Sequence, residues 1–227
     1  MKRFLLFDLG ETLVKYLSRE AFRASLPAVF ESIYSRLRHD LPEQREQYWA
    51  AMQRESHGNA DYSVRRLETR LSNVFGVPED AIEQNGLCEL FLAPTLAASK
   101  IYDDTEATVK ELSQHYTLAV ISNTPWGSPK RYFERDLERY RINCYFAQAV
   151  FCRDAGYRKP HAAIFQYALG LLGATPAEAL MVGDRYDWDI MGAIQCGVDA
   201  ILLDRDRTSD KDCRKIARLS DLLSLDL

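Results

Sequence analysis

The amino-acid sequence predicts an α/β protein, in which a parallel β-sheet core is interrupted by an inserted α-helical domain. Short apolar runs rich in β-branched and aromatic residues recur along the chain, as in buried strands. Helix-length segments separate the later runs, which is typical of parallel strands joined by helical crossovers. A long interval of helical pattern follows the first run. Of the 227 residues, 47% are hydrophobic, which is enough for a sizeable core.

Five apolar runs are predicted to form the sheet. They are almost uniformly apolar rather than alternating, because central parallel strands are covered by helices on both faces. The segments between the later runs predict the covering helices. The predicted strands are residues 3–8, 117–123, 144–151, 178–184 and 199–204, and the predicted helices are residues 104–115, 128–140, 161–173 and 187–197.

The interval between the first two strands is unusually long. It runs from Val14 to Ser99, whereas a crossover needs only about a dozen residues. Asp61 before Val64 predicts the start of a helix in this interval, and Gly76 before a proline predicts the end of one. The predicted helices of the interval are residues 19–40, 43–56, 61–76 and 78–94.

We interpret this interval as a helical domain inserted after the first strand. Its aromatic residues fall at helical spacing, so we expect them to form a core of their own. The predicted division is a core of residues 1–14 and 98–227 with an insert of residues 15–97. The aromatic residues of the insert core are Phe22, Phe30, Tyr34, Tyr48 and Trp49.

Charge and cysteine content argue against a nucleic-acid-binding protein and against a disulfide-bonded or metal-binding cysteine framework. Lysine and arginine number 29 against 33 acidic residues, a net charge of −4 that disfavours a nucleic-acid-binding surface. The five cysteines show no metal-binding spacing, and we expect reduced thiols in a cytoplasmic protein. The apolar run at the N-terminus is too short for a signal peptide, and no stretch approaches the length of a membrane span. The oligomeric state cannot be predicted from these features.

Several polar side chains follow the predicted strands where the chain leaves the sheet. Asp8 ends the first strand, Ser122 the second, and Asp184 the fourth, with Asp189 shortly after it. Ligands of open parallel sheets bind at this edge. Two bare carboxylates about 4 Å apart repel by roughly 4 kcal/mol at an effective dielectric constant near 20. The three aspartates can therefore share a pocket only if a cation joins them or one of them stays protonated. A hard dication fits the oxygen ligands, and Mg²⁺ is the usual choice where a phosphate also binds.

The same set of residues suggests phosphoryl chemistry. A carboxylate beside Mg²⁺ can attack phosphorus and form an aspartyl phosphate, which makes Asp8 the candidate nucleophile. Ser122 and Lys159, in the segment GYRKPHAAIF, would hold the phosphoryl oxygens and neutralise their charge.

Four segments in this order carry a family resemblance: FDLGETL, VISNT, GYRKPHAAIF and MVGDRYDWDIMGA. They resemble the four motifs of the haloacid dehalogenase-like (HAD) hydrolase superfamily. The resemblance implies a Rossmann-like core over residues 1–14 and 98–206, with the insert in the place of the helical cap. It also implies a phosphatase for a small phosphorylated metabolite. The implied catalytic residues are Asp8, Ser122, Lys159 and Glu11; the implied substrate ligands are Thr12, Ser122, Asn123 and Lys159; the implied metal ligands are Asp8, Gly10, Asp184 and Asp189.

One position departs from the family pattern. Phosphatases of this family usually carry a second aspartate two residues after the nucleophile, which protonates the leaving oxygen and then activates water. Gly10 occupies that place, and Glu11 occupies the place of the usual glycine. Glycine keeps the backbone carbonyl that binds the metal but supplies no acid, which is worth about 10²–10⁴ in rate.

Three outcomes follow from the missing acid. The enzyme could cleave only phosphates with good leaving groups, Glu11 could act as a substitute acid, or the protein could bind ligands without useful turnover. We expect a slow or leaving-group-selective phosphatase, because every other motif residue is present. The alternatives are a catalytically degenerate binding or regulatory protein and a 2-haloacid dehalogenase. The dehalogenases replace the Gly-Asp pair found here at Gly183 and Asp184.

Other residues near these motifs have more ordinary interpretations. Trp126 and Arg158 are candidates for the mouth of the pocket. The basic segment SVRRLETR, residues 63–70, is interpreted as a solvated helix face, with contact to an anionic substrate as the alternative.

Overall fold

The computed structural model describes residues 2–37, 44–55 and 59–227. The ends of two predicted helices, residues 38–40 and 43 together with residue 56, lie outside the described residues.

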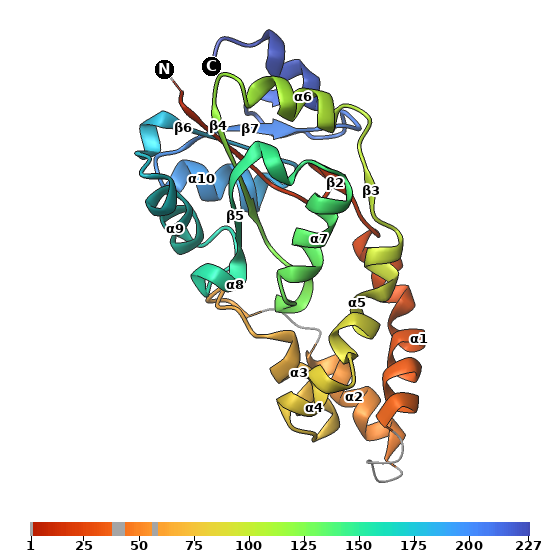
Figure 1. The fold of residues 1–227 in the computed structure, drawn as a ribbon. Helices are drawn as coiled ribbons and strands as arrows, with labels where there is room; N and C mark the ends of the chain where they lie inside the picture. The colour runs from red at the N-terminus through yellow and green to blue at the C-terminus, as the bar shows by residue number, and fades with distance from the viewer. Residues whose placement is uncertain (1, 38–43, 56–58) are drawn as a thin grey trace.

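A six-stranded parallel sheet forms the core, in the order β5-β4-β1-β6-β7-β8 (Figure 1). All five predicted strands are confirmed. The sixth, β8, has only two residues, too short for a hydrophobic pattern to mark it. The strands are β1 Phe4–Phe7, β4 Thr117–Ser122, β5 Phe146–Phe151, β6 Ala179–Gly183, β7 Asp199–Leu203 and β8 Lys215–Ile216.

Helices cover both faces of this sheet, which explains the uniformly apolar strands. Successive side chains point to opposite faces, so Leu5 and Phe7 pack in one cluster while Phe4 and Leu6 pack in the other. The first cluster includes residues of α6 and α7, and the second includes residues of α9 and α10. The helices of the core are α6 Thr105–Leu112, α7 Arg131–Arg139, α8 Cys152–Ala155, α9 Ala162–Leu172 and α10 Met191–Gln195. Short 3₁₀ helices lie at Pro125–Gly127, Asn143–Tyr145, Pro176–Glu178 and Leu219–Ser224, and a π-helical turn spans Tyr186–Ile190.

In the described part of the chain, the five helices between β2 and β3 form a separate group at the far end of the molecule (Figure 1). The chain enters and leaves this group through two short strands, β2 and β3, which pair antiparallel with Val14 opposite Ile101. The elements are β2 Val14–Lys15, α1 Arg19–Leu37, α2 Arg45–Glu55, α3 Leu67–Phe75, α4 Glu79–Gln84, α5 Leu87–Ala97 and β3 Lys100–Ile101.

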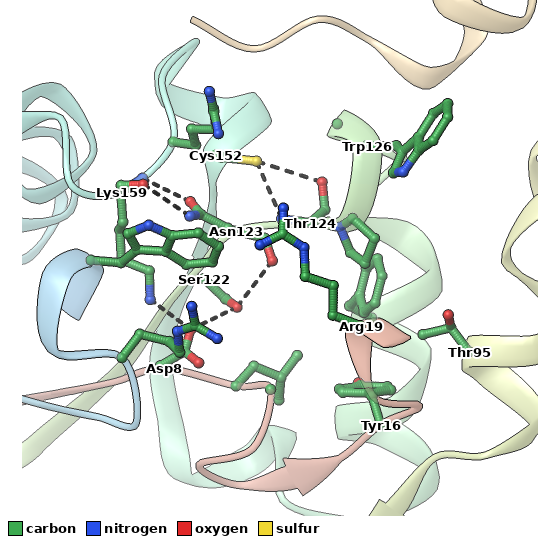
Figure 2. Close-up of a pocket in the computed structure, with 18 of the residues that line it drawn as sticks. Asp8, Tyr16, Arg19, Thr95, Ser122, Asn123, Thr124, Trp126, Cys152 and Lys159 are labelled. Carbon is green, nitrogen blue, oxygen red and sulfur yellow. Dashed lines mark hydrogen bonds and ion pairs between the residues drawn. The ribbon is translucent and has the colours of Figure 1, made fainter. Parts of the chain in front are cut away.

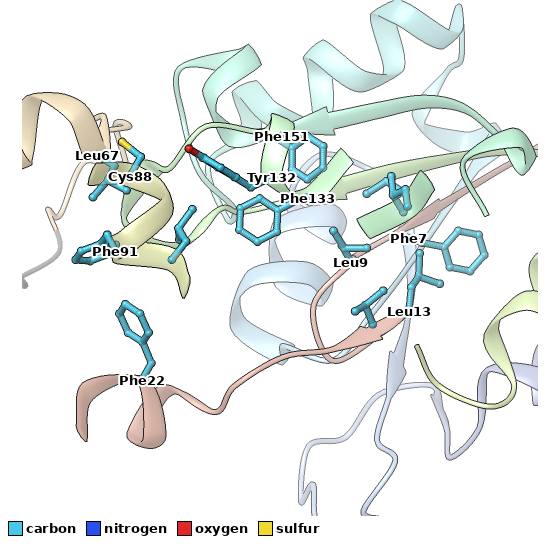
Figure 3. Packing of buried hydrophobic residues seen from close by; sticks show 14 of the residues in the cluster. Phe7, Leu9, Leu13, Phe22, Leu67, Cys88, Phe91, Tyr132, Phe133 and Phe151 are labelled. Atoms are coloured by element: carbon cyan, nitrogen blue, oxygen red, sulfur yellow. The ribbon is translucent and has the colours of Figure 1, made fainter. Parts of the chain in front are cut away.

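The predicted aromatic core of this helical group is confirmed. The ring of Phe30 lies 5.3 Å from that of Trp49 and 5.9 Å from that of Phe75, measured between centroids. The apolar contacts continue from these helices into the sheet, so that Phe22 and Phe7 belong to one buried cluster (Figure 3). The boundary of the insert as an independent domain stays a prediction.

Two helix predictions were wrong in detail. The predicted helix 78–94 is broken at Gly86, whose φ of 64° is left-handed and separates α4 from α5. The predicted helix 61–76 begins only at Leu67, because Ser63 pairs with Tyr157 in an isolated β-bridge. Asp61 accepts the Ser63 N–H at 3.1 Å and so stabilises a turn instead of the helix start. Gly76 does end α3, with a φ of 68°.

Among the residues that the structure describes, no helix has both the length and the apolar character needed to cross a bilayer.

Candidate active site

The register of the sheet places Asp8 between two other strand ends. Phe7 pairs with Val120 of β4 and with Val182 of β6, so Asp8 leaves the sheet where these three strands end. Its backbone N–H still donates to the carbonyl of Val182 at 2.9 Å, which fixes its position. Ser122 ends β4 and Asp184 follows β6, so both lie at the same edge.

Lys159 lies at the centre of this edge, with only 2% of its surface exposed. Its ammonium donates to Asp8 Oδ1 at 2.6 Å and to the Ile121 carbonyl at 2.7 Å, and it forms an ion pair with Asp189 at 2.6 Å (Figure 2). These contacts use all three of its N–H donors. Burial alone would lower the pKa of Lys159, but the negative charges of Asp189 and Asp8 outweigh burial and raise it, so this side chain is a fixed cation.

The segment after β4 positions both the serine and the lysine. Ser122 Oγ donates to Asp8 Oδ1 at 2.9 Å. The amide of Asn123 accepts the Lys159 N–H at 2.8 Å and donates to the Lys159 carbonyl at 3.1 Å (Figure 2). Asn123 was predicted as a substrate ligand. We infer that it acts by positioning Lys159, because the lysine backbone occupies both ends of its amide.

Three carboxylates gather beside this lysine. Asp8, Asp184 and Asp189 each offer an oxygen, and these oxygens lie within 4.8 Å of one another. Burial, followed by the charges of Asp8 and Asp189, raises the pKa of Asp184 to about 8. Burial also raises the pKa of Asp189, although Lys159 opposes it. An all-oxygen donor set with uncompensated negative charge fits Mg²⁺.

A glycine makes room for one of these carboxylates. A Cβ atom at Gly183 would lie 2.4 Å from the side chain of Asp189, which no real contact tolerates. The same Asp189 accepts the backbone N–H of Arg185 at 2.9 Å. The Gly-Asp pair at the end of β6 is therefore needed to bring Asp189 against the strand.

The crowding of these carboxylates predicts a pH-dependent stability in the absence of metal. The pKa of Asp184 is raised in the folded protein, so its protonated form contributes stability at low pH that is lost as the pH rises from about 4 through 8. We expect Asp184→Asn, unfolded by urea in EDTA, to be more stable than the parent by several kcal/mol at pH 8, since each pKa unit corresponds to about 1.4 kcal/mol, and equal to it near pH 4. Adding Mg²⁺ at pH 8 should stabilise the parent but not the variant.

The matched control is Asp187→Asn, which removes an exposed carboxylate from the same turn. It should change neither the pH profile nor the response to Mg²⁺. An Asp184→Asn variant less stable than the parent at pH 8 would contradict the proposed repulsion.

Glu11, predicted as a possible substitute acid, borders the cavity, but both of its carboxylate oxygens already accept hydrogen bonds. One of its carboxylate oxygens accepts the Tyr16 N–H and the other accepts the Tyr102 hydroxyl, both at 2.9 Å. Its φ of 59° lies in the left-handed region that favours glycine. The Arg205 guanidinium stacks on the ring of Tyr102 at 3.8 Å, which fixes this contact further.

We therefore expect Glu11→Gln to change kcat for an alkyl phosphate such as glycerol 3-phosphate by less than about threefold, since a positioned acid would be worth about 10²–10⁴ for such a poor leaving group. Loss of one charged acceptor should lower the free energy of unfolding by about 1 kcal/mol. A fall in kcat of a hundredfold or more, with loss of the basic limb of the pH–rate profile, would instead make Glu11 the acid.

Thr12, predicted as a substrate ligand, is fully buried and does not line the cavity. Its carbonyl accepts a hydrogen bond from Arg205 at 2.8 Å. The structure therefore does not bring Thr12 to the site where it brings Asp8, Ser122 and Lys159 together.

A cavity of about 400 Å³ opens between the sheet edge and the helical insert. Asp8, Ser122 and Asp184 lie on its core side, and Gly10 borders it as well. Trp126 lines it from the loop after β4, and Arg70 of α3 lies 4.1 Å above the ring of Trp126.

The sequence predicted the position of some of these cavity residues correctly and of others wrongly. Arg70 belongs to the segment that was interpreted as a solvated helix face, yet it is only 8% exposed. Trp126 and Arg158 line the cavity, in agreement with the prediction for them. Sequence reasoning missed Arg19 and Arg23, which lie at the start of α1 and also border the cavity. The sequence feature that could have identified them is their spacing of four residues, shortly after the first motif, which places both on one face of a helix.

Comparison with known proteins gives a consistent picture. The family model described as "haloacid dehalogenase-like hydrolase" matches residues 3–197. A glyceraldehyde 3-phosphate phosphatase of Methanothermobacter thermautotrophicus is 28% identical over 219 residues, which cover 92% of this chain and 88% of that protein. Another of the same name, from Pyrococcus abyssi, is 30% identical over 211 residues, 88% of this chain and 81% of that protein.

Solved structures share the whole architecture. A 2-haloacid dehalogenase of Pseudomonas syringae superposes with a TM-score of 0.71 at 25% identity, covering 99% of this chain and 97% of that chain. A HAD phosphatase of Thermococcus onnurineus superposes with a TM-score of 0.67 at 24% identity and the same coverage. The overall fold is therefore shared with both.

Proposed function

The chain belongs to the haloacid dehalogenase-like hydrolase family, and from this premise we propose that it is a Mg²⁺-dependent phosphatase of small phosphorylated metabolites. The observation that carries the proposal is the buried contact of Asp8 with Ser122 and Lys159 beside two further carboxylates. Relatives named as phosphatases support the same reaction class. The cytoplasmic location stays a prediction.

The residues suggest a two-step reaction. A carboxylate oxygen of Asp8 attacks phosphorus, and the bond to the leaving oxygen breaks, which gives an aspartyl phosphate. Water then cleaves this acyl phosphate, releasing inorganic phosphate and regenerating the carboxylate. Ser122 and the Lys159 ammonium orient Asp8 and stabilise negative charge on the phosphoryl oxygens.

Asp8, Asp184 and Asp189 are the proposed holders of Mg²⁺, with the Gly10 carbonyl as a further ligand. When bound, the ion supplies positive charge that brings a phosphoryl dianion next to a carboxylate.

The place of the usual acid is the glycine at position 10, so the leaving oxygen departs without a dedicated proton donor. This favours substrates whose leaving group is stable as an anion, such as acyl phosphates and sugar 1-phosphates. The proposed enzyme is therefore slow or selective, with acyl phosphates the better substrates.

The test is phosphate release from acetyl phosphate and p-nitrophenyl phosphate, with Mg²⁺ and with EDTA. The proposal expects release that requires Mg²⁺ and is faster with acetyl phosphate. No release from a broad panel of phosphates, together with measurable binding of Mg²⁺ and inorganic phosphate, would favour a binding or regulatory protein instead.

A second candidate is a 2-haloacid dehalogenase, favoured by the missing second acid and by similarity to a dehalogenase structure. There the aspartate attacks carbon and displaces halide. The crowded carboxylates weigh against it, since such a reaction gives them no cation to bind. Chloride release from 2-chloropropionate in EDTA would establish this alternative.

A further inference from the structure

The cavity carries more positive charge than one phosphoryl group needs. Among the described residues that line it, seven cationic side chains face four carboxylates. Lys159 is already engaged by Asp8 and Asp189, and the proposed Mg²⁺ would add two further charges on the same side. A phosphoryl dianion therefore leaves a cationic surplus, which a second anionic group on the ligand would reduce.

Two arginines of α1 are the cavity cations whose side chains have no partner among the described residues. Other cavity arginines have partners: Arg70 contacts Glu55 at 3.3 Å, and Arg158 donates to Asn59 at 2.8 Å. The exposed side chains of Arg19 and Arg23 both border the cavity, yet neither side chain makes a hydrogen bond, ion pair or ring contact with any residue in the described part of the chain. Figure 2 shows Arg19 reaching from the start of α1 toward Thr124, just after β4.

The two positive charges of this pair destabilise helix α1. Arg19 and Arg23 are four residues apart, so they lie on one face of α1 and repel each other. Arg19 also lies in the first turn of the helix, where the helix dipole disfavours positive charge. Their arrangement is therefore not explained by helix stability, whereas an anion between them would relieve both penalties.

We propose that Arg19 and Arg23 bind a second anionic group, a carboxylate or a second phosphate, of the same substrate whose phosphoryl group lies at Asp8. The proposal rests on the phosphatase function proposed above. A guanidinium fork suits either anion, because each offers two oxygens in one plane. Leu17, Phe22 and Leu26 line the cavity beside the pair and would contact the carbon skeleton. A cavity of about 400 Å³ restricts the ligand to a small metabolite.

The test is equilibrium binding, which does not depend on turnover. Calorimetry with the Asp8→Asn variant and Mg²⁺ would compare 3-phosphoglycerate with glycerol 3-phosphate, which replaces the carboxylate by a neutral group. Fructose 1,6-bisphosphate and fructose 6-phosphate form the matching pair for a second phosphate. We expect the doubly anionic member of at least one pair to bind at least about tenfold tighter, and the pair that responds identifies the anion.

Adding Arg19→Gln should remove that preference and leave the affinity for the neutral-ended ligand within about twofold. Arg36→Gln is the matched control, because it removes a charge from the last turn of the same helix, outside the cavity. Equal affinity within both pairs, or a preference that survives Arg19→Gln together with Arg23→Gln, would overturn the subsite.

Turnover separates this proposal from the phosphatase function. If the parent hydrolyses no phosphate yet keeps the arginine-dependent binding preference, the function fails and the subsite stands. If it hydrolyses both members of each pair with equal kcat/KM and binds them equally, the function stands and the subsite fails.

Discussion

Replacing Asp8 by asparagine is expected to lower kcat for acetyl phosphate by at least about 10³-fold, since the amide cannot act as the nucleophile. The substitution keeps the size and shape of the side chain. Its amide oxygen can still accept hydrogen bonds from Ser122 and Lys159, which now reach Asp8 Oδ1 at 2.9 and 2.6 Å. The loss should therefore be one of chemistry, with Tm close to that of the parent.

The measurement combines steady-state kinetics with intact-protein mass spectrometry. The parent, quenched in acid during turnover of acetyl phosphate, should carry one added phosphoryl group, and Asp8→Asn should carry none. Asp187→Asn, the exposed carboxylate in the turn after β6, should behave like the parent in both measurements. If Asp8→Asn keeps activity within tenfold of the parent, Asp8 is not the nucleophile.

The convergence of these side chains could be predicted from the sequence because it follows from strand order and direction. Apolar runs mark the parallel strands, and polar residues directly after them must meet at one edge of the sheet. Asp8, Ser122 and Asp184 belong to this class. Lys159 also reaches the edge, but its burial depends on the amide of Asn123, which holds its backbone from another loop.

The orientation of Glu11 could not be predicted in this way. Its partner Tyr102 lies 91 residues away, and the left-handed backbone at Glu11 has no signature in a residue that rarely adopts it. The burial of Arg70, which was interpreted as solvated, also depends on a contact between residues far apart in the sequence. Charge alternation describes a helix face, whereas its burial over Trp126 depends on a loop of the core. Long-range contacts of this kind decide which polar residues face the cavity.

Replacing Gly10 by aspartate is expected to raise kcat for alkyl phosphates such as glycerol 3-phosphate by about 10²-fold or more, because it restores a positioned acid. The backbone of Gly10 is not left-handed, and a Cβ atom there would lie 3.6 Å from Tyr16 Cδ2, an ordinary contact. The position borders the cavity, so the new carboxyl can reach the leaving oxygen of a bound ester. Acetyl phosphate needs little protonation and should change by less than about threefold.

Gly10→Asn is the matched control for this gain, since it adds the same bulk without an acid. It should leave the ratio of alkyl to acyl phosphate turnover unchanged, whereas Gly10→Asp should raise that ratio and add a basic limb to the pH–rate profile for the alkyl ester. A gain that is the same for both substrates would mean that the glycine limits binding or loop geometry and not protonation. A gain that Gly10→Asn shares would also mean that the glycine limits binding or loop geometry. Only a leaving-group-dependent gain identifies Gly10 as the place of the missing acid.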